Sequence, residues 1–278
     1  MSSDGSLCRV GAQRRHSVSD RNVFRVKYGW FRRARTVMLA MIRNDGGTMD
    51  STIARATTDK PEPVPDVAVA GLVATGITKT YRRGMWPRRR ELAVLRGADF
   101  EVGAGEVVGL VGENGSGKST LMKILVGALA ADSGNINVIG RMGYCPQEPV
   151  LYDRLTCEEH LELFGVAYGM DEAAVAEAAD GLYATLGFER WRTTRAEELS
   201  GGTRSKLNLA VALLADPEVL LLDEPYAGFD FDTYERFWDL TAERRAAGRS
   251  VVVISHFITD QARFDRIVEL RDGLTVPR

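Results

Sequence analysis

The 278-residue sequence has few of the residues that build disulfide frameworks and metal clusters. It contains three histidines and three cysteines, Cys8, Cys145 and Cys157, which are widely spaced and form no C-x-x-C pair. This excludes a disulfide framework or a cysteine zinc site and fits a reducing cytoplasm. Long apolar runs are also lacking. The longest near the N-terminus, at residues 37–42, is far shorter than the ~18–20 residues of a membrane-spanning helix.

Charge is unevenly distributed, although the formal net charge of the whole chain is only −2. Residues 1–48 hold ten Lys/Arg against three Asp/Glu, a net charge of +7, whereas residues 49–278 carry a net charge of −9. A nucleic-acid-binding domain needs a basic face. The acidic charge of the longer part therefore predicts that nucleic acid is not a partner.

The first 68 residues lack the apolar periodicity of a folded domain. Residues 1–48 are rich in Arg and Ser, which predicts a disordered basic extension, or a misplaced start with translation beginning at Met49. A transit peptide or a membrane-surface arm is the alternative interpretation. Three prolines at residues 61–65 predict an extended linker over residues 50–68. One α/β domain is then expected over residues 69–278.

A glycine-rich loop stands between an apolar run at residues 106–111 and a helical pattern at residues 121–126. Residues 112–119 match G-x-x-x-x-G-K-[ST] at every fixed position. Glycines let backbone N–H groups approach a phosphate, and the N-terminus of the next helix favours an anion. Lys118 can reach the β- and γ-phosphates, and the Ser119 hydroxyl can ligate Mg²⁺. The loop therefore predicts a nucleoside triphosphate site.

The segment before this loop is predicted to be rich in β-structure. Residues 72–78 form a predicted strand, residues 82–90 a polar loop, and residues 91–102 a pair of strands with a turn near Arg96-Gly97. Tyr81 precedes the glycine loop by about thirty residues and could stack on an adenine ring. A lone tyrosine at a strand end is more often part of the packing.

The pattern turns helical after predicted strands at residues 134–139 and 142–145. Prolines on both sides of Gln147 predict a stiff loop that can hold this side chain near a site. Thr156, followed by acidic residues, is a helix start. No strand signal appears between residues 145 and 199, which predicts a helical insertion at about residues 148–199 in an α/β core.

Two further clusters of polar residues follow this insertion. Ser-Gly-Gly at residues 200–202 opens a helical pattern and is a second anion-binding arrangement. Asp223 and Glu224 end a buried strand, where Mg²⁺ and an attacking water are expected beside a phosphate-binding loop. His256 follows the next apolar strand on the same predicted edge. A strand is predicted at residues 266–270 and a turn after it, so we expect no additional C-terminal domain in this sequence.

In this order, the motifs resemble those of the nucleotide-binding domain of ABC transporters over roughly residues 71–273. Walker motifs occur in many NTPases, and the added signature sequence makes the resemblance specific. Six motifs carry it: the Walker A loop at residues 112–120, the Q-loop Gln147, the signature motif at residues 199–203, Walker B with its glutamate at residues 219–224, the D-loop at residues 227–230 and the switch His256.

The resemblance implies a P-loop NTPase core with an N-terminal antiparallel β subdomain and an inserted α-helical subdomain. It implies a head-to-tail dimer with two ATP molecules between one subunit's Walker A loop and the other's signature motif. Glu224 would be the general base, and His256 would contact the γ-phosphate. Mg²⁺ and water would be organised by Ser119, Gln147 and Asp223. The implied nucleotide-binding residues are Tyr81, Gly112, Asn114, Gly115, Ser116, Gly117, Lys118, Ser119, Thr120, Ser200, Gly201 and Gly202.

Two residues depart from the family pattern. Thr203 stands where the family usually has glutamine, and Phe229 replaces the usual leucine of the D-loop. The Ser-Gly-Gly that meets phosphate is intact and both catalytic carboxylates are present, so we expect an active site. The short insertion and the lack of a C-terminal domain look more like bacterial export-type subunits than sugar importers.

The expected function is therefore the ATPase subunit of a transporter, held at the inner face of the cell membrane by separately encoded permease subunits. The alternative is a soluble ABC ATPase that acts on DNA or ribosomes. Chromosome-maintenance members carry a long coiled coil, but only 81 residues separate Lys118 from Ser200. Translation-factor members carry two nucleotide domains in one chain, whereas the motifs here predict one. The transported substrate is not encoded in a subunit of this kind.

Overall fold

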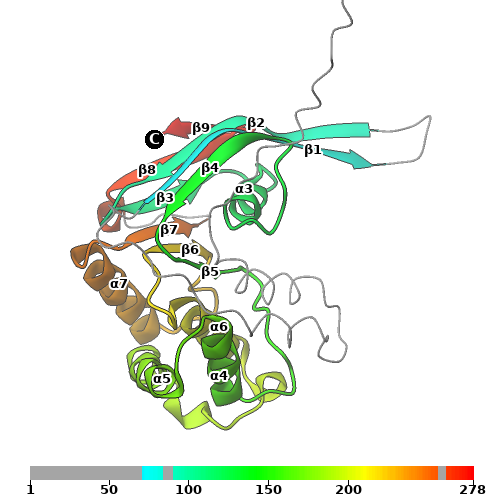
Figure 1. The fold of residues 1–278 in the computed structure, drawn as a ribbon. Coiled ribbons are helices and arrows are strands. Elements are labelled where there is room, and N and C mark those ends of the chain that lie inside the picture. The colour runs from blue at the N-terminus through cyan, green and yellow to red at the C-terminus, as the bar shows by residue number, and fades with distance from the viewer. Residues whose placement is uncertain (1–70, 84–89, 256–260) are drawn as a thin grey trace, which may run out of the picture.

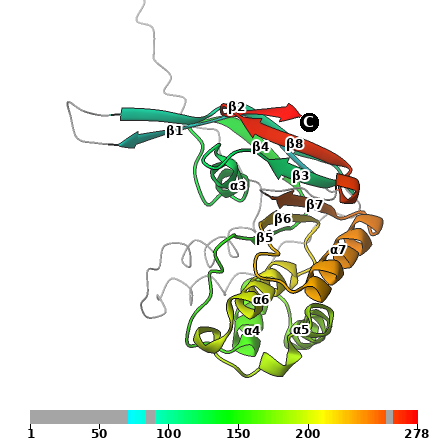
Figure 2. The same ribbon diagram turned by 180° about the vertical axis from the view of Figure 1, so that it is seen from behind.

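The structure is a computed structural model that describes residues 71–83, 90–255 and 261–278. The predicted extension and linker over residues 1–68 lie outside the described residues, and so does His256. Figure 1 shows two sheets stacked above a group of helices, and Figure 2 shows the same arrangement from behind.

The smaller sheet is antiparallel, with strand order β2-β1-β4, and consists of β1 (Gly71–Arg83), β2 (Arg90–Val102) and β4 (Ser133–Ile139). The predicted pair of strands over residues 91–102 was wrong, because β2 is one continuous strand. Ile77 pairs with Ala98 and Thr78 with Arg96, which leaves Gly97 as an unpaired bulge with φ 117°. The glycine that suggested a turn thus bends a strand without ending it.

The larger sheet has the order β5-β6-β7-β3-β8-β9 and is parallel except for its last strand. The sequence did not predict β9, which pairs with β8 after a two-residue turn at Asp272 and Gly273, both with positive φ. The strands are β3 (Val107–Val111), β5 (Met142–Cys145), β6 (Val219–Asp223), β7 (Ser250–Ile254), β8 (Arg266–Arg271) and β9 (Leu274–Pro277).

Helix α3 (Lys118–Leu125) lies between the two sheets in both views, and the other helices cover the opposite face of the larger sheet (Figures 1 and 2). The described residues contain no strand between β5 and β6, as predicted for the helical insertion. None of the described helices has the length and apolarity to cross a membrane. The remaining elements are α4 (Cys157–Ala167), α5 (Glu172–Leu186), α6 (Gly201–Leu213), α7 (Phe231–Ala246), η1 (Glu189–Trp191), η2 (Ala196–Glu198) and η3 (Gln261–Arg263).

The larger sheet separates two apolar cores. Leu221 of β6 and Val252 of β7 pack in the core that contains α3. Their neighbours Leu222 and Val253 pack in the core that contains α4 to α7. Successive side chains on a strand point to opposite faces, so a parallel sheet covered on both sides needs continuous apolar strands. Burying these strands fixes their carboxyl ends at one edge, where the glycine loop begins.

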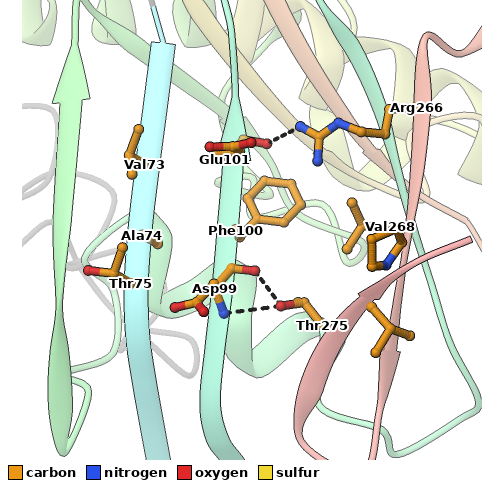
Figure 3. A pocket seen from close by; sticks show the side chains of 11 residues that line it. Val73, Ala74, Thr75, Asp99, Phe100, Glu101, Arg266, Val268 and Thr275 are labelled. Atoms are coloured by element: carbon orange, nitrogen blue, oxygen red, sulfur yellow. Dashed lines mark hydrogen bonds between the residues drawn. The ribbon is translucent and has the colours of Figure 1, made fainter.

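A groove of about 310 Å³ runs between the two sheets, with β1 and β2 on one side and β8 and β9 on the other (Figure 3). Phe100 is buried in its lining. The Asp99 N–H donates to Oγ1 of Thr275 at 3.0 Å, and the Arg266 guanidinium donates to the backbone oxygen of Glu101 at 2.8 Å. These polar groups bond one another across the groove, so they join the small sheet to the edge of the large one.

Candidate nucleotide-binding site

The glycine loop follows β3, which lies between β7 and β8 inside the larger sheet. At Gly112 φ is 151°, and a Cβ there would lie 2.5 Å from the carbonyl oxygen of Leu270. At Gly117 φ is 107°, and a Cβ would lie 2.7 Å from Cγ1 of Val94. Both positions therefore require glycine, because the loop has the backbone of β8 on one side and β2 on the other.

The N-terminus of α3 has the properties of an anion site. Its N-cap, Gly117, offers no side-chain hydrogen bond to the first-turn N–H groups. The Ser116 hydroxyl is one of the few buried polar side-chain atoms in the described residues that have no hydrogen-bond partner. A phosphate can accept from such amide and hydroxyl groups, and the helix dipole favours its charge. These features fit the predicted nucleotide.

Lys118 lies across the mouth of the loop with its side chain mostly buried. Its Nζ donates to the carbonyl oxygens of Gly112 at 2.7 Å and Glu113 at 3.0 Å. Burial lowers the pKa of Lys118, and the nearby carboxylates of Glu224 and Asp223 act in the opposite direction. The ammonium is thus held where phosphate oxygens would meet the loop.

Asp223 ends β6 and is buried, with 3% of its surface exposed. Burial raises its pKa, the hydrogen bond from Ser119 lowers it, and the charge of Glu224 raises it again. A hydroxyl and a carboxylate in contact provide the oxygen ligands that Mg²⁺ prefers. The structure thus brings together two of the three predicted metal ligands.

Glu224 directly follows Asp223 and has φ 50°, which is uncommon for a residue with a side chain. Its N–H donates to the carbonyl oxygen of Ile254 at the end of β7, at 3.1 Å. Its Oε2 accepts from Nε2 of Gln147 at 3.2 Å. The third predicted metal ligand, Gln147, therefore lies at the same edge and bonds the predicted base.

Tyr81 approaches the glycine loop from the smaller sheet. Its hydroxyl lies 3.5 Å from Oγ1 of Thr120 in the first turn of α3, and 39% of the residue is exposed. Asn114 and Gly115 are exposed at the tip of the loop. An exposed ring beside the loop can stack on a base, and the adenine contact of Tyr81 stays a prediction.

Ser200 forms the N-cap of α6, the signature helix. Its Oγ accepts from the Thr203 N–H at 3.3 Å and lies 2.9 Å from Oγ1 of Thr203. Thr203, which departs from the family pattern, thus supports the cap. Among the described residues, no hydrogen bond or ion pair joins residues 200–202 to the glycine loop. Within one chain, then, this predicted element is not brought to the other site residues.

Sequence reasoning missed the contact between the signature helix and the D-loop. A Cβ on Gly202 would lie 2.4 Å from the carbonyl oxygen of Gly228. The Ser205 hydroxyl donates to the carbonyl oxygen of Ala227 at 3.0 Å. Phe229, the second residue that departs from the family pattern, packs against the apolar core that contains α4 to α7. The Gly-Gly pair was the available signal, because it permits backbones to touch.

A central strand that leads into a glycine loop, with carboxylates after a strand two places away, defines a P-loop NTPase. A model of the ABC transporter family matches residues 95–227. The human phospholipid-transporting ATPase ABCA3 is 31% identical over 226 residues, which cover 76% of this chain but only 13% of that protein. This chain belongs to the ABC transporter family.

In two further comparisons the match covers a larger share of the other protein. The Nod factor export ATP-binding protein I of Burkholderia lata is 33% identical over 204 residues, which cover 69% of this chain and 67% of that protein. A solved dimeric structure of a bacterial ABC transporter cassette is 25% identical with a TM-score of 0.66, covering 73% of this chain and 95% of that one. The predicted ABC ATPase fold is confirmed.

Proposed function

We propose that this chain hydrolyses ATP as the ATP-binding subunit of an ABC transporter that exports its substrate through separately encoded permease subunits. Membership of the family and similarity to a Nod factor export protein support this proposal. The observation that carries it is the grouping of Lys118, Asp223, Glu224 and Gln147 around one glycine loop.

The residues of the loop would hold the triphosphate. Lys118 would turn from the carbonyl oxygens that it bonds to the β- and γ-phosphates, and the first-turn N–H groups of α3 would bond phosphate oxygens. Ser119, Asp223 and Gln147 would hold Mg²⁺. Bound Mg²⁺ would supply positive charge that offsets the charge of the phosphates. Tyr81 would stack on the adenine.

Glu224 would accept the proton of the attacking water, and Gln147, which bonds it, would help to orient both. His256, outside the described residues, would contact the γ-phosphate. Asp223, which directly precedes Glu224 at the end of β6, would hold the metal beside this base.

The second half of the site would come from a second copy of the chain. The N-terminus of the partner's α6, with residues 200–202, would bond the γ-phosphate of ATP on this subunit's loop. In the described part of the chain no hydrogen bond joins these two elements, which supports this arrangement, as does the solved dimeric cassette. Attachment to the inner face of a membrane would then come from the permease subunits.

The division of the chain into an extension (residues 1–68) and an ATPase domain (residues 69–278) is part of the same proposal. The insertion at about residues 148–199 would be the helical subdomain, which contains α4 and α5. Limited proteolysis followed by mass spectrometry tests this division. We expect the first cuts before residue 69, and early cuts within residues 90–255 would contradict it.

The direct test is Glu224→Gln. Glutamine keeps the shape of the side chain but cannot accept the proton of water, so ATP should still bind while phosphate release falls about a hundredfold or more. Because this variant does not hydrolyse the ATP bound between the two subunits, it should form a stable dimer with ATP. Size-exclusion chromatography coupled to light scattering measures this. Wild-type turnover by Glu224→Gln would contradict the assignment of the base.

A further inference from the structure

The side chain of Asn208 reaches from the signature helix to the residues directly before Gln147. It is buried, with 6% of the residue exposed. Its Nδ2 donates to the carbonyl oxygen of Pro146 at 2.8 Å and lies 3.2 Å from Sγ of Cys145. One amide group of α6 therefore holds two neighbouring residues at the end of β5.

Close packing of β5 against α6 makes this reach possible. A Cβ on Gly143 would lie 2.3 Å from the carbonyl oxygen of Ala212, so only glycine permits this approach of strand and helix. Asn208 stands one turn before Ala212, on the same side of the helix. It therefore meets the strand where it ends and the Q-loop begins.

Pro146, which Asn208 bonds, is linked to Glu224 through Gln147. Pro146 has a fixed φ, so holding its carbonyl oxygen also restrains the peptide that leads to Gln147. The Gln147 amide then bonds Oε2 of Glu224 at 3.2 Å. We propose that Asn208 is a positioning residue for ATP hydrolysis, acting through Pro146 and Gln147 on Glu224. This inference rests on the proposed ATPase function.

A purely structural role would not call for an amide at this place. A buried polar group is unfavourable unless it is hydrogen-bonded, and an apolar side chain would fill a contact between helix and strand equally well. Here the bonds of the Asn208 NH₂ group go to the segment that leads into the Q-loop. The amide therefore specifies where Gln147 begins relative to the signature helix.

The test is Asn208→Leu, which has the same number and branching of side-chain heavy atoms but no donor. We expect kcat for ATP to fall about tenfold, because one hydrogen bond that orients the Q-loop is lost. KM for ATP should change less than about twofold, since the hydrogen bonds of Asn208 go to Cys145 and Pro146, which are not among the predicted phosphate-binding residues. Thr241→Val is the matched control, because it removes another buried bond from a side chain to a backbone carbonyl, in α7. Its kcat should equal that of the wild type.

A double-mutant cycle with Gln147→Ala separates positioning from a general loss of stability. If Asn208 acts through Gln147, adding Asn208→Leu to Gln147→Ala should lower kcat no further. Additive losses, or an unchanged kcat in a folded Asn208→Leu protein, would overturn the inference. Asn208→Ala adds no bulk and replaces Asn208→Leu if that variant fails to fold. If the wild-type chain has no ATPase activity, the proposed function is overturned as well. If the wild type is active, the kcat values of the Asn208 variants test the positioning role alone.

Discussion

The two helix ends that are predicted to bind anions, those of α3 and α6, are built differently. The N-cap of α3 is Gly117, which provides no side-chain bond, and the neighbouring Ser116 hydroxyl is buried without a partner. The N-cap of α6 is Ser200, whose Oγ accepts from the Thr203 N–H. The end of α3 has a lysine at its mouth, whereas the first turn of α6 has no basic or acidic residue at residues 200–203.

This difference indicates which part of nucleotide binding each helix end performs. The end of α3 needs an anion to satisfy its polar groups, so it should bind the triphosphate by itself. The end of α6 is already satisfied in part by its own serine. It has only its remaining amides and its dipole to offer, and should act on a phosphate that another element holds. Changes at the N-terminus of α3 should therefore abolish ATP turnover, and changes at the N-terminus of α6 should affect the ATP-dependent dimer.

The largest effect should come from Lys118→Ala, which removes the only cation bonded within the described part of the glycine loop. We expect ATP turnover to fall by about a hundredfold or more, because the phosphates lose a fixed positive partner. Phosphate release measures this. Lys123→Ala, on the exposed side of the same helix, is the charge-matched control and should retain turnover. Release by Lys118→Ala within a few-fold of wild type would sink the prediction.

A smaller and more specific effect should follow from Ser200→Arg in a Glu224→Gln background. Arginine adds bulk and charge where the partner's γ-phosphate must lie, so the ATP-dependent dimer should be lost while each monomer still binds ATP. Ser200→Ala is the control. It removes the cap, at about 1 kcal/mol of stability, but leaves the amides open, and it should still dimerise. Light scattering with a fluorescent ATP analogue follows both properties, and loss of ATP binding by Ser200→Arg would contradict this division.

The α3 end could be predicted from the sequence, because a loop, its strand and its helix are contiguous. The environment of α6 could not, since it depends on contacts between distant segments. Asn208 and Pro146 are 62 residues apart, and nothing in the local pattern marks the bond. The strand β9 was missed because four residues that include a proline give little periodicity. Gly97 looked like a turn because an isolated glycine fits a turn and a bulge equally well.

The smallest effect is a pH dependence of folding stability that arises in α4, which packs in the same apolar core as α6. His160 of α4 is buried, its Nε2 accepts from the Tyr152 N–H at 2.9 Å, and its Nδ1 lies 2.7 Å from the Thr156 carbonyl oxygen. Burial lowers the pKa of His160. The Thr156 carbonyl opposes this, Arg204 adds to it, and the charges of Glu159 and Asp153 oppose it.

Because the pKa of His160 is lower in the folded chain than its ordinary value near 6.5, the unfolded chain takes up the proton first as pH falls. Its stabilisation should thus be complete above about pH 6.5 and decline below it, by at most about 1.4 kcal/mol per pH unit. Urea unfolding at several pH values, with His160→Gln as the non-titrating reference, measures the difference in slope. The affinity of the α3 end for ATP should change equally with pH in both proteins. An unfolding slope that is the same in both would show that His160 keeps its ordinary pKa, and an affinity difference would show that the two ends do not act independently.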